Sequence, residues 1–267
     1  MIKLEIITIK EAIEEAGGNE QLFQEMADKF RQWLQQQLHL PQEISDEKLR
    51  CTILTAKFDL EKAKKYLDSQ YTLRNLIPEF FADCDPLGES VARFHKCLYL
   101  FIIANIRAEE DTAIPEISIM DCTHLTLSHI LKYSPTIMKK CDLSMQAYGK
   151  RYKAVYFINA PTYIEQLASI FKMVLKPKLF ARLRFLTSGI ESVCEDIPKS
   201  ILPADYGGEE ASMDTLTDMW RAKLMERREW LLAQEKLKTN ESLRTDSVIN
   251  PNDLFGVTGT FRKLEID

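Results

Sequence analysis

A β-strand followed at once by an amphipathic helix is predicted between residues 153 and 184, KAVYFINAPTYIEQLASIFKMVLKPKLFARLR. Residues 154–158 are a β-type apolar run, and Asn159-Ala160-Pro161 ends it because proline cannot donate to a ladder and asparagine favours turns. Helical periodicity then continues to Lys176-Pro177. The apolar face of this helix consists of Tyr163, Ile164, Leu167, Ile170, Phe171, Val174 and Leu175.

Two interpretations of this helix remain open from periodicity alone. Burial of its apolar side chains would contribute roughly 10–20 kcal/mol, at about 1.5–3 kcal/mol each. The helix could simply complete a core against a sheet, as amphipathic helices usually do. Alternatively, it could cover a ligand cavity, with the cations that follow it facing a membrane.

Charge is distributed unevenly along the chain. Residues 132–184 contain eleven Lys or Arg and two Asp or Glu, a local net charge of +9. The whole 267-residue chain has a net charge of −5, so the remainder carries −14. The overall acidity argues against a general nucleic-acid binder. The sorted charge instead predicts one basic surface directed at an anionic partner.

Sequence motifs for common chemistries are absent. The chain lacks the glycine-rich nucleotide-binding loops and the G-x-S-x-G nucleophile motif. Its six cysteines form no C-x-x-C pair, so we expect free thiols, no metal and no cofactor. A Cys122–His124 nucleophile pair has no third group to orient it, and Asp121 is expected to cap a strand end. We therefore expect a protein that is not an enzyme.

The expected location is the cytoplasm. No uncharged run reaches the ~18–20 residues that a membrane span needs, and charges at Lys3, Glu5 and Lys10 interrupt the N-terminal apolar residues. Association with a membrane should therefore be peripheral.

The order of predicted elements indicates an α/β protein. Residues 1–80 read as helices, with Ser45 and Asp59 as N-caps. Predicted helices at 91–107 and 125–140, strands at 116–121 and 185–187, and a long helix at 213–237 follow. This order predicts a helical N-terminal region, a lobe with a mostly parallel sheet, and a C-terminal helix with a docking tail. We place the boundaries at 1–80, 81–210 and 211–267.

Several runs, in the same order, resemble the CRAL-TRIO lipid-binding family, most closely its insect alpha-tocopherol-transfer-like members. They are LTAKFDLEKAKKYLD, YTLR with IPEFF, MDCTHLTLSHILKYSPTIMKK, KAVYFINAP, IPKSILPADYGG and GTFRKLEID. Each run alone is weakly specific, but together they span nearly the whole chain.

The resemblance implies a lobe that encloses one hydrophobic ligand beneath a mobile gate, here residues 163–175. The pocket would be lined by Phe101, Ile119, Leu125, Leu127, Phe157, Ile164, Leu167, Phe171 and Val174. Cations beside the gate would hold a phosphoinositide headgroup, and they correspond to Arg151, Lys153, Lys176, Lys178 and Arg182. A tocopherol, retinoid, carotenoid or phospholipid would suit such a pocket.

The chain departs from the family between Phe81 and Val91. Members usually have a strand-forming run there, for which this chain has no room, so the sheet could lack one strand. Members also commonly carry basic residues before the K-F-D run, where this chain has Cys51, Leu54 and Thr55. We expect a protein that transfers lipid between membranes. The alternative is a membrane-recruited interaction scaffold that transfers no ligand.

Overall fold

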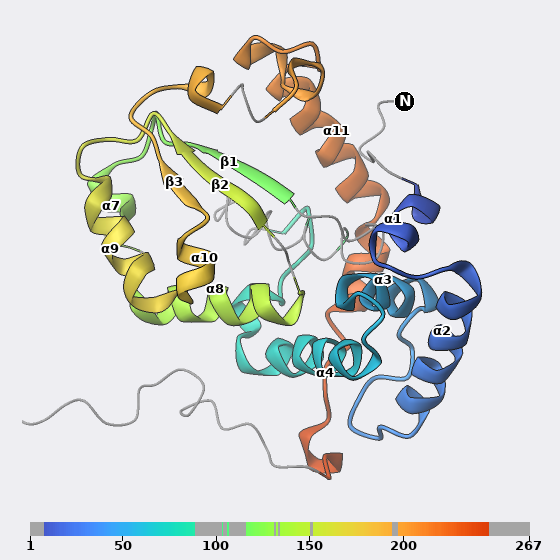
Figure 1. Ribbon diagram of the computed structural model, residues 1–267. Helices are drawn as coiled ribbons and strands as arrows, with labels where there is room; N and C mark the ends of the chain where they lie inside the picture. The colour runs from blue at the N-terminus through green and yellow to red at the C-terminus, as the bar shows by residue number, and fades with distance from the viewer. Residues whose placement is uncertain are drawn as a thin grey trace, which may run out of the picture.

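The computed structural model describes residues 8–88, 103, 106, 116–130, 132, 134–149, 152–193 and 197–245. Within them a helical N-terminal region, a lobe built on a parallel sheet and a C-terminal pair of helices follow one another (Figure 1). The expected CRAL-TRIO-like α/β fold is therefore confirmed. The predicted helix at 91–107, the question of a missing strand and the tail after residue 245 lie largely or wholly outside the described residues.

The N-terminal region is a bundle of amphipathic helices. Ser45 and Asp59 are the N-caps expected from sequence, since each side chain accepts a hydrogen bond from the backbone N–H three residues later. The apolar faces meet in one core that includes Phe30, Leu49 and Leu67. The helices are α1 (Ile9–Glu15), α2 (Glu20–Gln35), α3 (Asp46–Ala56) and α4 (Leu60–Leu76), followed by the short helix η1 (Pro78–Phe80).

Two leucines near the ends of α2 are exposed. Leu38 lies beyond the end of α2 at Gln35, where helical spacing no longer decides which way a side chain points. Leu22 lies in the first turn, at the edge of the bundle.

The described sheet has three parallel strands in the order β1–β2–β3. Met120 of β1 pairs with Phe157 of β2, which pairs with Phe185 of β3. Because side chains alternate along a strand, these three residues share one face. The strands are β1 (Glu116–Asp121), β2 (Tyr152–Ile158) and β3 (Leu183–Phe185). The last begins two residues before the predicted position.

Helices of the lobe pack on the Phe157 face of the sheet. Gly149 follows α8 with a φ of +61°, as expected for the residue after a helix end. A Cβ there would lie 2.4 Å from the Thr55 side chain, so the glycine also permits close approach to α3. The helices are α7 (Leu127–Ile130), α8 (Pro135–Ala147), α9 (Ile164–Val174) and α10 (Pro177–Phe180).

The opposite face of the sheet packs on irregular chain. Tyr156 and Ile158 form a cluster there with Val193 and Leu202. The covering segment contains three short helices, η2 (Ile190–Val193), η3 (Lys199–Ile201) and η4 (Ala204–Tyr206).

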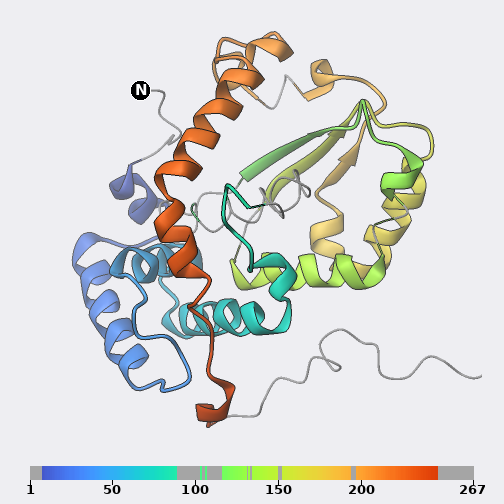
Figure 2. The ribbon, with the colours of Figure 1, turned by 180° about the vertical axis from the view of Figure 1, so that it is seen from behind.

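The C-terminal segment joins the lobe to the N-terminal region (Figure 2). The single helix predicted at 213–237 is interrupted at Arg227, so two helices form instead. Arg228 then pairs with Asp85 through two hydrogen bonds, at 2.8 and 2.7 Å. These elements are α11 (Met213–Glu226), α12 (Arg228–Gln234) and the short helix η5 (Glu241–Leu243). Among the described residues, no helix is long and apolar enough to cross a membrane.

Candidate functional site

The apolar face that the sequence predicted for α9 is buried against the sheet. Ile164, Leu167 and Phe171 belong to one cluster with Phe157 of β2. The helix begins after the turn at Pro161, and Leu175 ends it with an extended backbone. Helix α9 thus presents a continuous apolar surface to the sheet.

Three aromatic rings fill the space between α9 and the strands. The Phe157 and Phe185 rings are stacked, with centroids 4.8 Å apart. The Phe171 ring lies 5.8 Å from Phe157 and 6.3 Å from Phe185. These are contact distances for aromatic pairs. In this conformation the helix therefore lies directly on the sheet at Phe171, and rings rather than a hollow fill that space.

The structure brings four of the nine predicted pocket residues together, namely Phe157, Ile164, Leu167 and Phe171. Leu125 packs beside them, half-buried, and its carbonyl accepts a 2.6 Å hydrogen bond from the hydroxyl of Tyr163.

Two of the other four predicted pocket residues, Ile119 and Leu127, do not belong to this cluster. Ile119 pairs with Tyr156 and belongs to the cluster on the opposite face of the sheet. Leu127 is 48% exposed. Phe101 lies outside the described residues, as does the side chain of Val174.

The predicted headgroup cations differ in how freely they can reach a ligand. Lys153, Lys176 and Lys178 are exposed. Arg182 is half-buried and donates to the backbone carbonyl of Tyr152, so it braces the start of β2. Arg151 lies outside the described residues. We call Lys172, Lys176 and Lys178, which lie around the α9–α10 junction, the cationic corner.

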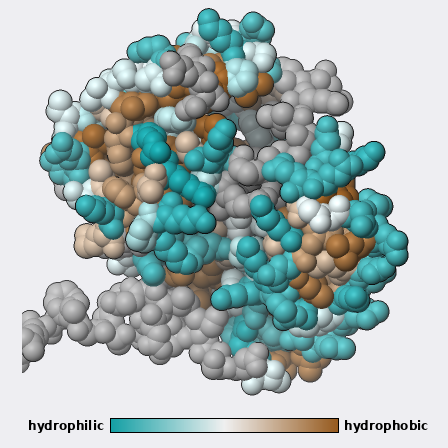
Figure 3. All heavy atoms as spheres, in the orientation of Figure 1, coloured by the Kyte–Doolittle hydropathy of each residue, from teal (hydrophilic) through white to brown (hydrophobic). Residues whose placement is uncertain are grey.

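Apolar side chains are exposed near the same helices. Met173 of α9 is 69% exposed, and Leu127 and Ile137 are exposed on α7 and α8. Figure 3 shows apolar atoms over the side of the lobe that carries α9 and β3, bordered by hydrophilic residues. The outer surface of α9 therefore combines an exposed apolar side chain with positive charge.

Sequence reasoning missed a polar chain that ties this corner to α8. The Lys176 ammonium donates a 2.6 Å hydrogen bond to Gln146 Oε1. The Gln146 amide donates in turn to Asp142 Oδ2, at 2.6 Å. The Asp142 side chain is buried, with the residue only 2% exposed, and its Oδ1 has no hydrogen-bond partner in the part of the chain that the structure describes. Burial raises the pKa of Asp142, while Lys139 and Lys176 oppose that rise.

A second polar centre lies where β1 ends. Asp121 Oδ1 accepts hydrogen bonds from the Thr123 hydroxyl and backbone N–H and from the Asn159 amide, and Oδ2 accepts one from Tyr206. Burial raises the pKa of Asp121, but these donors outweigh it and lower the pKa to about 2. The carboxylate holds three segments together, as a strand-end cap should.

No hydrogen bond joins Cys122 to His124 among the described contacts, so the two do not form a nucleophilic pair in this conformation. Cys122 is buried, and its Sγ lies 3.6 Å from the Met120 carbonyl oxygen. Burial raises the pKa of the Cys122 thiol, which disfavours the nucleophilic thiolate. Within the described ranges, no group of three His, Cys, Asp or Glu side chains could hold a metal ion.

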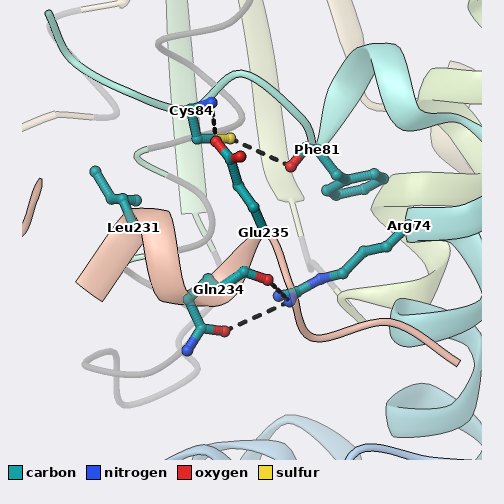
Figure 4. Close-up of a pocket in the computed structure, with 6 residues that line it drawn as sticks. All are labelled: Arg74, Phe81, Cys84, Leu231, Gln234 and Glu235. Carbon is teal, nitrogen blue, oxygen red and sulfur yellow. Dashed lines mark hydrogen bonds between the residues drawn. The ribbon is translucent and has the colours of Figure 1, made fainter. Parts of the chain in front are cut away.

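A small hollow lies between the N-terminal region and α12, away from α9. Its volume of about 10 Å³ is room for one water molecule. Arg74 lies at its edge and donates to the carbonyl of Gln234 (Figure 4). It also donates to the carbonyl of Leu237. Glu235 accepts from the Cys84 backbone N–H at 2.5 Å. The hollow belongs to a structural joint and is too small for a lipid.

Residues 19–91 match the family described as Pinta-like, UBA domain. The human protein named alpha-tocopherol transfer protein-like is 30% identical over 141 residues, which cover 52% of this chain and 40% of the relative.

This chain is similar to alpha-tocopherol transfer protein-like proteins. The mouse protein of that name is 28% identical over 52% of this chain and 39% of its own length. Rat clavesin-2 is 24% identical over 51% of this chain and 42% of its own length. The matches thus span about two-fifths of the relatives, and they support the CRAL-TRIO resemblance.

Proposed function

We propose that this protein binds a single hydrophobic molecule and transfers it between membranes, with α9 as the gate. The observation that carries the proposal is the character of α9 itself. Its inner face is buried on aromatic rings, its outer face exposes Met173, and its C-terminal end joins the cationic corner. Similarity to proteins named for tocopherol transfer supports the same role.

The ligand would occupy the face of the sheet that α9 now covers. Phe157, Phe171 and Phe185 contact one another in the closed form, and they would line the pocket once α9 lifts. Such a lining is apolar and suits a molecule with a long hydrocarbon body. We propose a tocopherol, retinoid, carotenoid or phospholipid, carried without any chemical change.

Gate opening should require a membrane. Exposing Ile164, Leu167 and Phe171 to water would cost about 4.5–9 kcal/mol, at about 1.5–3 kcal/mol each. Each Lys near an anionic leaflet contributes only about 1 kcal/mol. Charge alone therefore cannot open the gate, so the exposed face must enter the lipid as it leaves the sheet.

The proposed partner surface is an anionic leaflet that contains phosphoinositide, at the cytoplasmic face of a membrane. Lys153, Lys176 and Lys178 are exposed and could reach a headgroup, and we place Arg151 with them. We propose that Arg182 supports this site by holding β2 and β3 in register rather than by binding the headgroup. We also propose that the lipid-binding lobe spans residues 81–210, between the helical N-terminal region and the C-terminal segment.

Native mass spectrometry of the protein purified from cells tests the proposal. We expect one apolar molecule per chain, identified by extraction. Variant F171W overfills the aromatic cluster and should be recovered without it. The exposed variant M173W adds the same side chain on the outer face and should keep the ligand. Recovery of wild type without any bound molecule, from cells and after incubation with lipid extract, would contradict transfer.

One observation favours a second candidate function. The direct packing of Phe171 on Phe157 and Phe185 is what a permanently closed lobe would show. Such a protein would be a membrane-recruited scaffold that transfers no ligand. Under this alternative the wild-type protein would bind anionic vesicles, yet it would carry no apolar molecule under any condition.

A further inference from the structure

A hydrogen bond links the junction between α9 and α10 to Gln146 of α8, and a second one, within α8, continues from Gln146 to Asp142. Lys176 lies at this junction, just before the first residue of α10. Its ammonium reaches the Gln146 amide oxygen, and the Gln146 amide nitrogen reaches Asp142. Since Gln146 and Asp142 are one helical turn apart on α8, their geometry is fixed before Lys176 joins them.

The inner end of this chain is a buried carboxylate. Asp142 is 2% exposed, and one of its carboxylate oxygens has no hydrogen-bond partner among the described residues. A buried carboxylate needs compensating positive charge. Lys139 on α8 and Lys176 at the junction supply it. The carboxylate therefore attracts Lys176 inward through Gln146, although the Lys176 side chain is otherwise exposed.

Lys176 is hydrogen-bonded to α8, whereas the nearby cation Lys178 of α10 is not. Lys178 is exposed two residues further on, and among the described residues it makes no hydrogen bond or ion pair. A headgroup phosphate can pair with Lys178 without breaking any described contact. The Lys176 ammonium has three N–H donors and uses one of them on Gln146, so a phosphate that draws this ammonium outward lengthens and then breaks the contact with Gln146.

We propose that Gln146 and Asp142 form a latch that holds the α9–α10 junction closed, and that a membrane phosphate ester opens it by taking Lys176. This inference rests on the proposed function, and it assigns positioning roles to two residues that contact no transported ligand. The headgroup would thus act both as an anchor and as the trigger that frees the end of the gate.

Hydrogen exchange in solution tests the latch without any membrane or transported ligand. The amides of Leu179, Phe180 and Ala181 are bonded within the junction and report on its opening. Variant Q146L should speed their exchange about fivefold, the effect of losing one net hydrogen bond. K176Q should do the same, whereas the matched control K178Q should match wild type.

A second variant protects the test against misfolding. Q146L alone leaves both oxygens of Asp142 without a hydrogen bond, whereas D142N/Q146L removes the buried charge as well. The double variant should also show faster exchange at the junction. Unchanged exchange in Q146L, or in D142N/Q146L if Q146L does not fold, would overturn the latch.

Vesicles then separate the trigger from the latch. Vesicles with increasing fractions of phosphatidylinositol 4-phosphate would be mixed with protein that carries a fluorescent lipid. Q146L should release the fluorescent lipid at a lower fraction of phosphatidylinositol 4-phosphate than wild type does, and K176Q should require a higher fraction. Soluble inositol 1,4-bisphosphate should speed junction exchange in wild type but not in K176Q. No effect of either probe on wild type would contradict the trigger. Failure of wild type to release lipid to any vesicle would count against transfer, while the exchange result would still decide the latch.

Discussion

The ring of Phe171 in α9 lies 5.8 Å from the ring of Phe157 in β2, measured between centroids. This contact is one of those that attach the proposed gate to the sheet. Its strength contributes to the free energy that a membrane must supply to lift the helix. The same contact also makes α9 part of the core, so stability and gating are linked.

Replacing Phe171 with alanine should lower the free energy of unfolding by about 3–5 kcal/mol, as for other large-to-small core substitutions. Urea unfolding followed by circular dichroism measures the change. Met173 on the same helix is 69% exposed, so M173A should change stability by less than about 0.5 kcal/mol. Equal effects of the two variants would show that α9 does not bear on the sheet.

Replacing Asp142 with asparagine should stabilise the protein at neutral pH. Burial raises the pKa of Asp142, so the folded state binds its proton more tightly than the unfolded state does. The charged carboxylate therefore costs stability above its folded pKa and costs nothing below the unfolded value of 3.8.

Thermal unfolding of D142N and wild type across pH 3–8 tests this sign. The midpoint of D142N should be higher at pH 7, and the two curves should converge near pH 3. A lower midpoint for D142N at pH 7 would mean that Lys139 and Lys176 compensate the carboxylate more fully than its burial indicates.

Local sequence signals predicted the elements well where one chemical rule decides the outcome. Ser45 and Asp59 cap helices because their side chains can accept from the backbone N–H three residues later. Asn159 has a φ of +52°, and with Pro161 it ends β2 as expected. The amphipathic face of α9 was visible because its partners are all apolar.

Features that depend on register or on distant residues could not be predicted. Ile119 lies on the far face of the sheet because it pairs with Tyr156, and an offset of one residue reverses the face of a strand. The contact between Lys176 and Gln146 spans thirty residues and involves a neutral amide, so charge counting gave no signal for it. The interruption at Arg227 lies within a run of good helix formers.

Arg244 should be among the most important charged residues for stability. Its side chain is only 3% exposed and donates to both oxygens of Asp68, at 2.9 and 2.8 Å. Variant R244A should cost about 3–5 kcal/mol, because it leaves a partly buried carboxylate without its partner. The exposed pair of Arg221 and Asp218 is the control, and R221A should cost about 0–1 kcal/mol.

Chemical denaturation of both variants at pH 7 measures these differences. Burial raises the pKa of Asp68, but the hydrogen bonds and charge of Arg244 outweigh it and lower the pKa overall. The contribution of the pair should therefore weaken as the pH falls below 3.8. If R244A were no more destabilising than R221A, the C-terminal segment would not be fastened to α4 through this contact.

The Asp121 centre should make a contribution that is lost in acid. Its donors lower the pKa of Asp121 to about 2, so its stabilising effect should fade between pH 3.8 and about 2. Variant D121N should therefore be less stable than wild type at pH 7 and should approach it near pH 2. Y206F removes one donor and should cost about 1 kcal/mol. An NMR titration that places the Asp121 pKa near 4 would refute the assigned hydrogen bonds.

Ligand release measured by stopped-flow fluorescence tests the gate most directly. Protein loaded with a fluorescent hydrophobic ligand would be mixed with vesicles that contain phosphatidylinositol 4-phosphate, with neutral vesicles, or with buffer alone. We predict rapid release to the anionic vesicles, much slower release to neutral vesicles and almost none to buffer. Equal release rates under all three conditions would contradict a gate that opens at an anionic membrane.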